Sequence, residues 1–166
     1  SQINHTLKTY GPLDEPNACL LLGQFFESQS QIRQAYHELV RATELTTTDP
    51  EPLLFVANMF VTYGMPDKTQ PFIDKLRTMK QAKPFQIEQE MRLIKIETGV
   101  RLLQDDLETA EKYLTGQLQP HMETLPGLRT LLGFYMDNEL PEKALPILDL
   151  WIKENPRSEE HTSEPQ

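Results

Sequence analysis

The stretches MPDKTQPFIDKL (65–76) and LPEKALPILDLW (140–151) follow nearly the same residue pattern, 75 positions apart. In both, an apolar residue is followed by Pro, an acid, Lys, a small residue, a variable one, Pro, two apolar residues and Asp. Self-similarity at a fixed spacing is the sequence signature of stacked repeats, whose periods are about 20 to 50 residues. The separation of 75 positions is longer than one such period, so the two stretches are interpreted as the same helix in two repeats that are not adjacent.

The period follows from the small residue that opens each expected second helix. These residues stand 34, 41 and 34 positions apart, and a large apolar residue follows each of them after four positions. The small residues are Ala35, Thr69, Ala110 and Ala144, and the apolar ones are Leu39, Ile73, Leu114 and Leu148. One step of 34 and one of 41 give the 75 residues between the two quoted stretches.

Each unit is expected to be a pair of antiparallel helices. Apolar residues recur at three- and four-residue spacing, as one buried stripe of a helix requires. No stretch alternates in the manner of a half-buried strand, so we expect no sheet. The expected pairs are 17–28 with 31–45, 49–63 with a helix from about 67, 84–103 with 106–118, and 128–138 with 141–155.

Three local features refine this expectation. The seven extra residues of the middle step amount to about two helical turns, so we expect longer helices on either side of residues 79–91. Gly64 is expected to end the helix before the first quoted stretch. Pro71 and Pro146 fall in or just after the first turn of their helices, where amides are largely unpaired, so neither should break its helix.

With these positions the chain resembles the tetratricopeptide repeat (TPR) family, over Asn17 to Pro156. The matching positions are Leu22, Gly23, Phe26, Ala35, Leu39 and Ala42 in unit one, Val56, Ala57, Phe60 and Ile73 in unit two, Ala110 and Leu114 in unit three, and Ala144, Leu148 and Pro156 in unit four. The family's Trp early in the first helix is absent, and Trp151 stands where a small residue is usual. The resemblance implies an all-α superhelix, a solenoid of about four helical hairpins.

The remaining segments are assigned separately. We expect residues 1–16 to be the end of a preceding repeat helix and a linker, because Ile3, Leu7 and Tyr10 have helical spacing. Residues 157–166, RSEEHTSEPQ, resemble a translated sequencing adapter except at Pro165, so we expect a non-native tail. The repeat array would then occupy residues 17–156, and the chain would be a fragment at both ends.

The composition argues against several classes of function. The net charge of −9 opposes nucleic-acid binding, which needs clustered Lys and Arg. The longest apolar run, LLFVANMFV (53–61), is too short to cross a bilayer, so we expect no membrane insertion in this stretch of chain. The single cysteine, Cys19, allows no internal disulfide. No feature assigns a localisation.

We expect no enzyme activity, no cofactor and no metal. The four histidines are scattered, and none has the spacing that places two ligands on one helix face; they are His5, His37, His121 and His161. Cys19 lies in the apolar run CLLLG and is interpreted as a small core residue. The acids at Asp105, Asp106 and Glu108 are explained by the helix start that follows them.

The resemblance also implies a concave groove, lined by the first helices, that holds a peptide or a partner helix. Matching that lining residue by residue gives Gln24, Asn58, Thr62, Arg92, Lys95 and Arg129. Asn58 resembles the family's Asn that grips a peptide backbone. Lys95 and Arg129 would favour an acidic peptide or a C-terminal carboxylate. The alternative for these two residues is that they are ordinary solvated charges.

The leading prediction is therefore a non-catalytic scaffold for protein–protein interaction. One alternative is an accessory repeat domain of a larger enzyme or of a membrane-associated assembly protein. A less favoured one is an RNA-processing helical repeat, whose groove would need to be basic.

Overall fold

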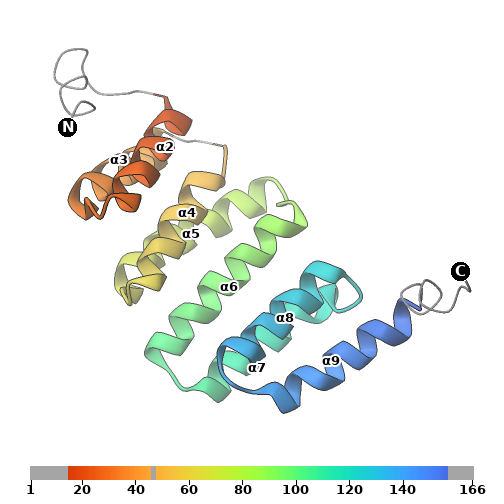
Figure 1. The fold of residues 1–166 in the computed structure, drawn as a ribbon. Coiled ribbons are helices and arrows are strands. Elements are labelled where there is room, and N and C mark those ends of the chain that lie inside the picture. Colours follow the sequence, from red (N-terminus) through yellow and green to blue (C-terminus); the bar gives the residue numbers. More distant parts are fainter. Residues whose placement is uncertain (1–14, 46–47, 157–166) are drawn as a thin grey trace, which may run out of the picture. The chain divides into compact units, whose positions relative to one another are not determined.

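The computed structural model describes residues 15–45 and 48–156, and this part of the chain is all α-helical (Figure 1). It contains eight α-helices, one short 3₁₀ turn and no strand, which confirms the expected all-α class. The helices are α2 (Pro16–Ser28), α3 (Ile32–Leu45), α4 (Glu51–Thr62), α5 (Pro66–Ala82), α6 (Ile87–Gln104), α7 (Leu107–Leu118), α8 (Leu125–Asp137) and α9 (Pro141–Glu154), with the turn η1 (Gln119–His121) after α7.

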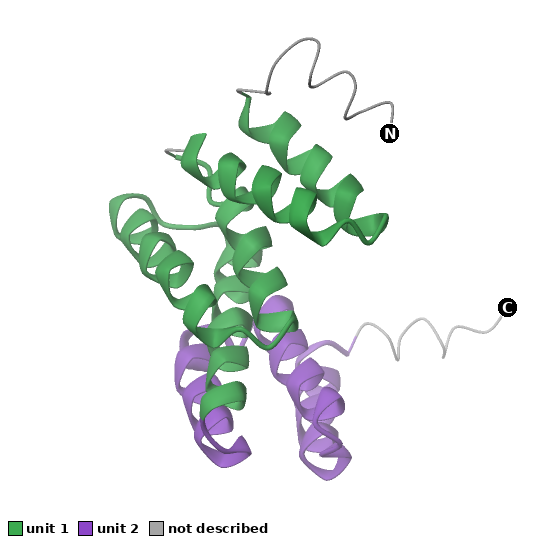
Figure 2. Ribbon diagram, turned by 90° about the vertical axis from the view of Figure 1, so that its left-hand side faces the viewer, with its two compact units in different colours: residues 1–104 green, residues 105–166 purple. Residues whose placement is uncertain are grey.

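The chain forms two compact units, residues 1–104 and residues 105–166 (Figure 2). Unit 1 contains α2 to α6, and unit 2 contains α7 to α9. The boundary falls between α6 and α7, the two helices of the third expected hairpin. Each unit is therefore described by itself. The expected tail at 157–166 and most of the expected N-terminal segment, 1–14, lie outside the described residues.

Within unit 1, hairpins stack in sequence order. Helices α2 and α3 form one pair and α4 and α5 the next, and α4 also contacts α2, α3 and α6. The first helices of successive pairs run parallel. The end of α2 meets the end of α4, where the Tyr63 hydroxyl lies 3.3 Å from Oε1 of Glu27. The start of α4 meets the start of α6, where Arg92 pairs with Glu51.

Among the described residues of unit 1, α4 contributes to two apolar cores. The first contains Phe26, Ala35, Leu39, Val56, Met59 and Phe60, between α2, α3 and α4. The second contains Leu53, Leu54, Ala57, Ile73, Leu76, Leu93, Ile96 and Val100, between α4, α5 and α6. Because α4 is apolar on two sides, neighbouring hairpins on each side bury it. Phe72 of α5 packs against both cores.

The lysines of the two quoted stretches make corresponding contacts. Lys68 lies 5.9 Å from the centre of the Phe60 ring, and Lys143 lies 6.0 Å from that of Tyr135. Both pairs are 75 positions apart, like the stretches themselves. Each lysine also contacts a residue two α-helices earlier in the chain, Lys68 the Tyr36 ring on α3 and Lys143 the Glu111 carboxylate on α7. Tyr36 and Glu111 are again 75 positions apart. The repeat read from the sequence is thus present in the contacts of both units.

The ends of the first helices repeat with the same period. Ser30, Gly64 and Glu139 have φ angles of 57°, 72° and 58°, and they are 34 and 75 positions apart. After each of them, the next amide donates a hydrogen bond five residues back, as from Met65 to the Phe60 carbonyl at 2.9 Å. These are Schellman ends, in which a left-handed residue satisfies the last carbonyls. The expected stop at Gly64 is confirmed.

The expected lengthening is also found, with small differences at helix starts. Helices α5 and α6 have 17 and 18 residues, against 12 in α4, and α5 runs unbroken through Pro71. Helix α6 begins at Ile87 rather than near Pro84. Lys83, which precedes that proline, is extended with φ −147° and ψ 119°, because the proline ring disfavours helical backbone at the residue before it.

The left-handed positions give a stability test. We expect Gly64→Ala to destabilise the protein by about 1 kcal/mol, because a Cβ is disfavoured at positive φ. No neighbouring atom lies within 4 Å of the added Cβ, so the cost is conformational. Glu139→Gly should stabilise by up to about 1 kcal/mol for the same reason. Urea unfolding at pH 7 measures both changes.

Gly116, in the last turn of α7, is the matched control. It too has no atom within 4 Å of an added Cβ, but its φ is not positive. Gly116→Ala should therefore stabilise by about 0.5 to 1 kcal/mol, since alanine is the better helix former. If Gly64→Ala and Gly116→Ala changed the free energy of unfolding in the same direction, the assigned helix end would be wrong.

The contact between α2 and α3 gives a second test. Ala35 is fully buried, and a Cβ added to Gly23 would lie 2.5 Å from Cγ of Leu39, so these helices are in close contact. Ala35→Arg would place a long charged side chain in that contact and should cost at least about 3 kcal/mol. A thermal melt followed by circular dichroism should show a large loss, whereas Gln34→Arg, at an exposed position of α3, should melt like the parent.

Candidate functional site

Helix α4 exposes a narrow polar strip between its two buried sides. Asn58 and Thr62 are exposed, one turn apart, and the Thr62 hydroxyl donates a hydrogen bond of 2.8 Å to the Asn58 carbonyl. Ala57 and Met59 on either side of Asn58 are buried. Within the described residues, the side-chain amide of Asn58 forms no hydrogen bond. It is therefore available to a ligand as both donor and acceptor.

Helix α6 lies beside α4 and exposes Lys95. The two helices approach closely at Gly99, where an added Cβ would lie 3.2 Å from a methyl group of Val61. Lys95 forms no ion pair or hydrogen bond with the residues that the structure describes. Asn58, Thr62 and Lys95 are thus exposed on two neighbouring parallel helices, and we call these three residues the α4/α6 strip.

Arg92 is engaged inside unit 1. Its guanidinium pairs with the carboxylate of Glu51, which also accepts a hydrogen bond of 3.2 Å from the Gln89 amide. Burial by itself would raise the pKa of Glu51, but the hydrogen bonds from Arg92 and Gln89 outweigh it and hold the pKa below the usual value. Arg92 therefore joins the starts of α4 and α6, and its charge is already neutralised.

The exposed apolar residues of α2 were not identified from the sequence. Gln24, the predicted groove residue of this helix, is half-buried. Beside it, Leu21 is 67 % exposed and Phe25 42 % exposed. The spacing in the sequence could have indicated them, because Leu21 and Phe25 are four residues apart and so share one side of the helix. The buried residues of α2 lie on another side, and they are Cys19, Gly23 and Phe26. Because α2 is apolar on most sides, the sequence did not show which of its apolar residues are exposed.

Arg129 belongs to unit 2 and is exposed on α8. It stands 75 positions after Leu54, which is fully buried against α6 in unit 1. The structure brings Asn58, Thr62, Arg92 and Lys95 onto two adjacent helices, with Gln24 on the neighbouring α2. It describes Arg129 only in the other unit.

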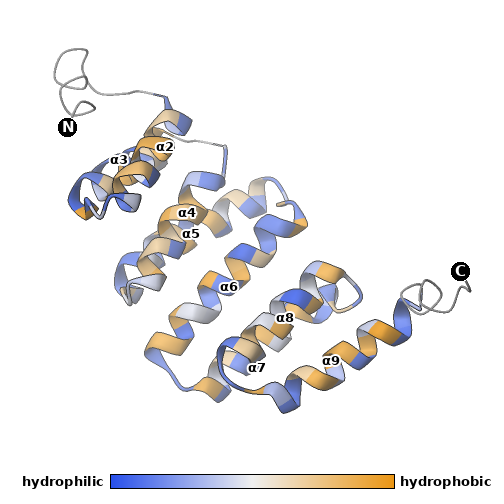
Figure 3. Cartoon of the chain, in the orientation of Figure 1, coloured by the Kyte–Doolittle hydropathy of each residue, from blue (hydrophilic) through white to orange (hydrophobic). Residues whose placement is uncertain are grey.

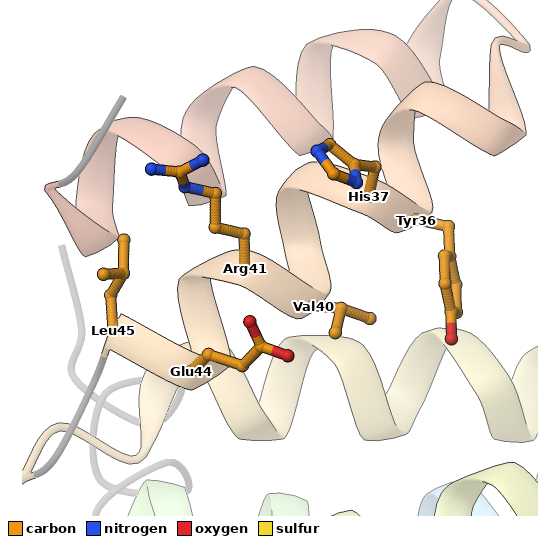
Figure 4. A pocket seen from close by; sticks show the side chains of 6 residues that line it. All are labelled: Tyr36, His37, Val40, Arg41, Glu44 and Leu45. Carbon is orange, nitrogen blue, oxygen red and sulfur yellow. The ribbon is translucent and has the colours of Figure 1, made fainter. Parts of the chain in front are cut away.

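Hollows lie along the second helices in the described part of unit 1. The first, of about 440 Å³, is formed along α3 by Tyr36, His37, Val40, Arg41, Glu44 and Leu45. Figure 4 shows these side chains spread along the helix, with Tyr36 at one end and Leu45 at the other. The second, of about 630 Å³, lies between α3, α4 and α5, and its lining includes Leu53, Asp74 and Met79. Polar groups do not converge on one point in Figure 4.

The residues with reactive side chains are placed as follows. Cys19 is fully buried, as expected for a core residue, and burial together with the charge of Glu38 raises the pKa of its thiol. A raised pKa disfavours the nucleophilic thiolate. In the described segments, no group of three or more His, Cys, Asp or Glu side chains is arranged to hold a metal. His5 and His161 lie outside these segments.

No protein-family model, no curated protein and no solved structure matches this chain. Among the described helices, none is long and apolar enough to span a membrane.

The Glu51–Arg92 pair predicts a pH dependence. Because the pKa of Glu51 is lowered in the folded state, its stabilising contribution is present above the unfolded pKa and is lost as the pH falls through the folded value. Glu51→Gln should therefore lower the free energy of unfolding at pH 7, by less than about 1 kcal/mol because the pair is partly exposed.

Urea unfolding of the parent and of Glu51→Gln, measured from pH 7 to pH 3, checks this prediction. The difference between the two proteins should shrink as the pH decreases. Glu123→Gln, at an exposed position between η1 and α8, should give no comparable difference at either pH. A difference for Glu51→Gln that stays constant with pH would contradict the proposed ion pair.

Proposed function

We propose that this chain is a non-catalytic protein-interaction module of the TPR type, which binds a peptide or partner helix along its first helices. The observation that carries this proposal is the α4/α6 strip. Its exposed amide and exposed ammonium group, which are unpaired among the described residues, lie on two parallel helices held together by a buried core. Such a surface offers hydrogen bonds and one positive charge without moving the core, as a rigid recognition site requires.

Three features support the assignment to a TPR-like array that forms an α–α superhelix. The helix ends at Ser30, Gly64 and Glu139 preserve the period of the sequence. Small residues lie where helices meet closely, as at Gly23 against Leu39. The first helices of unit 1 run parallel in sequence order, which is how repeats of helical hairpins stack.

The charges favour an acidic partner. Lys95 is exposed, whereas the charge of Arg92 is engaged with Glu51, so Lys95 supplies the positive charge of the α4/α6 strip. The chain as a whole carries a net charge of −9, so a basic patch of this size has little background attraction for RNA. We propose a peptide that carries a carboxylate for Lys95 and whose backbone bonds to Asn58.

We propose that exposed residues of α2 add an apolar part to this site, since they neighbour Gln24, which corresponds to Asn58 at the 34-residue spacing. Leu21 and Phe25 are exposed on the helix that carries Gln24, and α2 contacts α4. Large exposed apolar side chains at helical spacing are common anchors for partner peptides. The proposed ligand therefore combines apolar side chains for α2 with an acid for α6.

A peptide array tests this proposal. Peptides of varied sequence are probed with the parent chain, and those that bind should contain an acid together with large apolar residues. Lys95→Glu should weaken binding to acidic peptides by about tenfold or more, since it replaces an attraction by a repulsion. Asn58→Ala should weaken the binding of acidic and neutral peptides alike, by about 1 kcal/mol, because it removes hydrogen bonds to the peptide backbone.

Lys112→Glu, at an exposed position of α7, is the matched control for overall charge. It makes the same change in net charge far along the chain from the strip and should leave the array pattern unchanged. If Lys95→Glu and Asn58→Ala bound every peptide as the parent does, the assigned site would be wrong.

A further inference from the structure

The hairpin of α8 and α9 in unit 2 has an apolar face whose counterpart in unit 1 is covered by α6. We infer that this face docks an amphipathic helix of a partner polypeptide, antiparallel to α9. The two hairpins are related by the 75-residue spacing of the quoted stretches, so each residue of α8 and α9 has a counterpart in α4 and α5. Their degrees of burial can therefore be compared position by position.

In unit 1, α6 covers this face completely. Ile73 and Leu76 of α5 are 2 % and 0 % exposed, and they pack against Leu93, Ile96 and Val100 of α6. Helix α6 runs antiparallel to α5: Arg77 pairs with Glu97, and Lys80 pairs with Glu90 at 2.6 Å. Leu54 and Ala57 of α4 complete the buried face.

In unit 2, the counterparts of these residues are more exposed. Leu148, which corresponds to Ile73, is 40 % exposed, and Met136, which corresponds to Val61, is 58 % exposed. We call the residues of unit 2 that correspond to this covered face of unit 1 the α8/α9 face. They are Arg129, Leu132, Met136, Leu148 and Trp151, and they correspond to Leu54, Ala57, Val61, Ile73 and Leu76. Figure 3 shows hydrophobic residues along most of α9. A helix that is apolar on several sides is normally buried by neighbours.

The counterpart in unit 1 also specifies the occupant. A helix in the place of α6 needs apolar residues spaced like Leu93, Ile96 and Val100, which is a spacing of three and four positions. Arg129 stands where unit 1 has the buried Leu54, which shares a core with Leu93, so the occupant should carry an acid where α6 has Leu93. An apolar stripe interrupted by one acid that meets Arg129 therefore describes the partner.

A second copy of this chain is a poorer occupant. Four large apolar residues of α9 are exposed, namely Leu145, Leu148, Leu150 and Ile152. A second copy would present the same α8/α9 face, which contains Arg129 and no acid to pair with it. The net charge of −9 on each copy also opposes association.

A helix of known sequence serves as the probe. A fluorescein-labelled peptide of residues 87–104, the sequence of α6, is titrated with the full chain and followed by fluorescence anisotropy. We expect saturable binding that Leu148→Asp weakens by about tenfold or more, because the charge would enter the apolar contact. Leu145→Asp is the matched control: Leu145 is 61 % exposed on the same helix, but it corresponds to the exposed Gln70.

Leu145→Asp should therefore bind the peptide within about twofold of the parent. Far-UV circular dichroism of both variants confirms that each remains folded. Absence of binding to the parent, or an equal loss in the two variants, would overturn the proposal. Concentration-dependent dimerisation of the parent in sedimentation velocity, abolished by Leu148→Asp, would assign the face to a second copy and overturn it as well.

A charge test examines the role of Arg129. The same peptide with Leu93→Glu should bind the parent chain at least about threefold more tightly than the unmodified peptide, because the acid meets Arg129. The Arg129→Leu variant should instead bind the unmodified peptide more tightly than the Leu93→Glu peptide, because the acid then meets an apolar side chain. An unchanged preference would show that Arg129 does not face the docked helix. None of these variants changes Asn58 or Lys95 of the chain, and Arg129 and Leu148 belong to unit 2, so a loss of binding in Leu148→Asp alone is distinguished from binding at the α4/α6 strip.

Discussion

The structure depends on the burial of α4 from two sides. This helix carries the run LLFVANMF (53–60), whose apolar side chains point in more directions than one neighbour could cover. Leu53, Leu54 and Ala57 enter the core with α5 and α6, while Val56, Met59 and Phe60 enter the core with α2 and α3. A single hairpin cannot bury such a helix, so neighbouring hairpins must stack. The stacking in turn leaves Asn58 and Thr62 exposed in a fixed position.

Polar contacts set the register in which these hairpins stack. Tyr63 with Glu27, and Arg92 with Glu51, join equivalent ends of successive first helices. They are partly exposed, so each contributes little stability. Their effect is to favour one alignment of the helices over alternatives that bury similar apolar area. The lysines of the two quoted stretches make the same kind of contact with an aromatic ring in both units.

The two proposed binding surfaces differ in chemistry because their positions in the repeat differ. The α4/α6 strip is the side of the first helices left free when hairpins stack, so it is polar and exposes the cation of Lys95. The α8/α9 face is a stacking surface, so it is apolar, with Arg129 at a position that is apolar in unit 1. The first would recognise a peptide by hydrogen bonds and charge, and the second a helix by apolar contact.

The sequence alone determined the helical class, the 34-residue period and the helix end at Gly64. These follow from local physics: the spacing of apolar residues, the glycine at Gly64 and the tolerance of a helix for Pro71 near its start. The predicted burial of Cys19 was also correct, because it lies in an apolar run on one side of a helix.

Only the tertiary structure decided which polar groups are free. Arg92 and Lys95 look equivalent in the sequence, yet Glu51, 41 residues before Arg92, engages one and leaves the other exposed. Leu148 has the same position in the repeat as the buried Leu39 and Ile73, yet it is 40 % exposed, because hydrophobicity does not reveal which side of a helix has a neighbour. Pairing and burial depend on residues distant in the chain, and periodicity specifies a helix face without specifying what covers it.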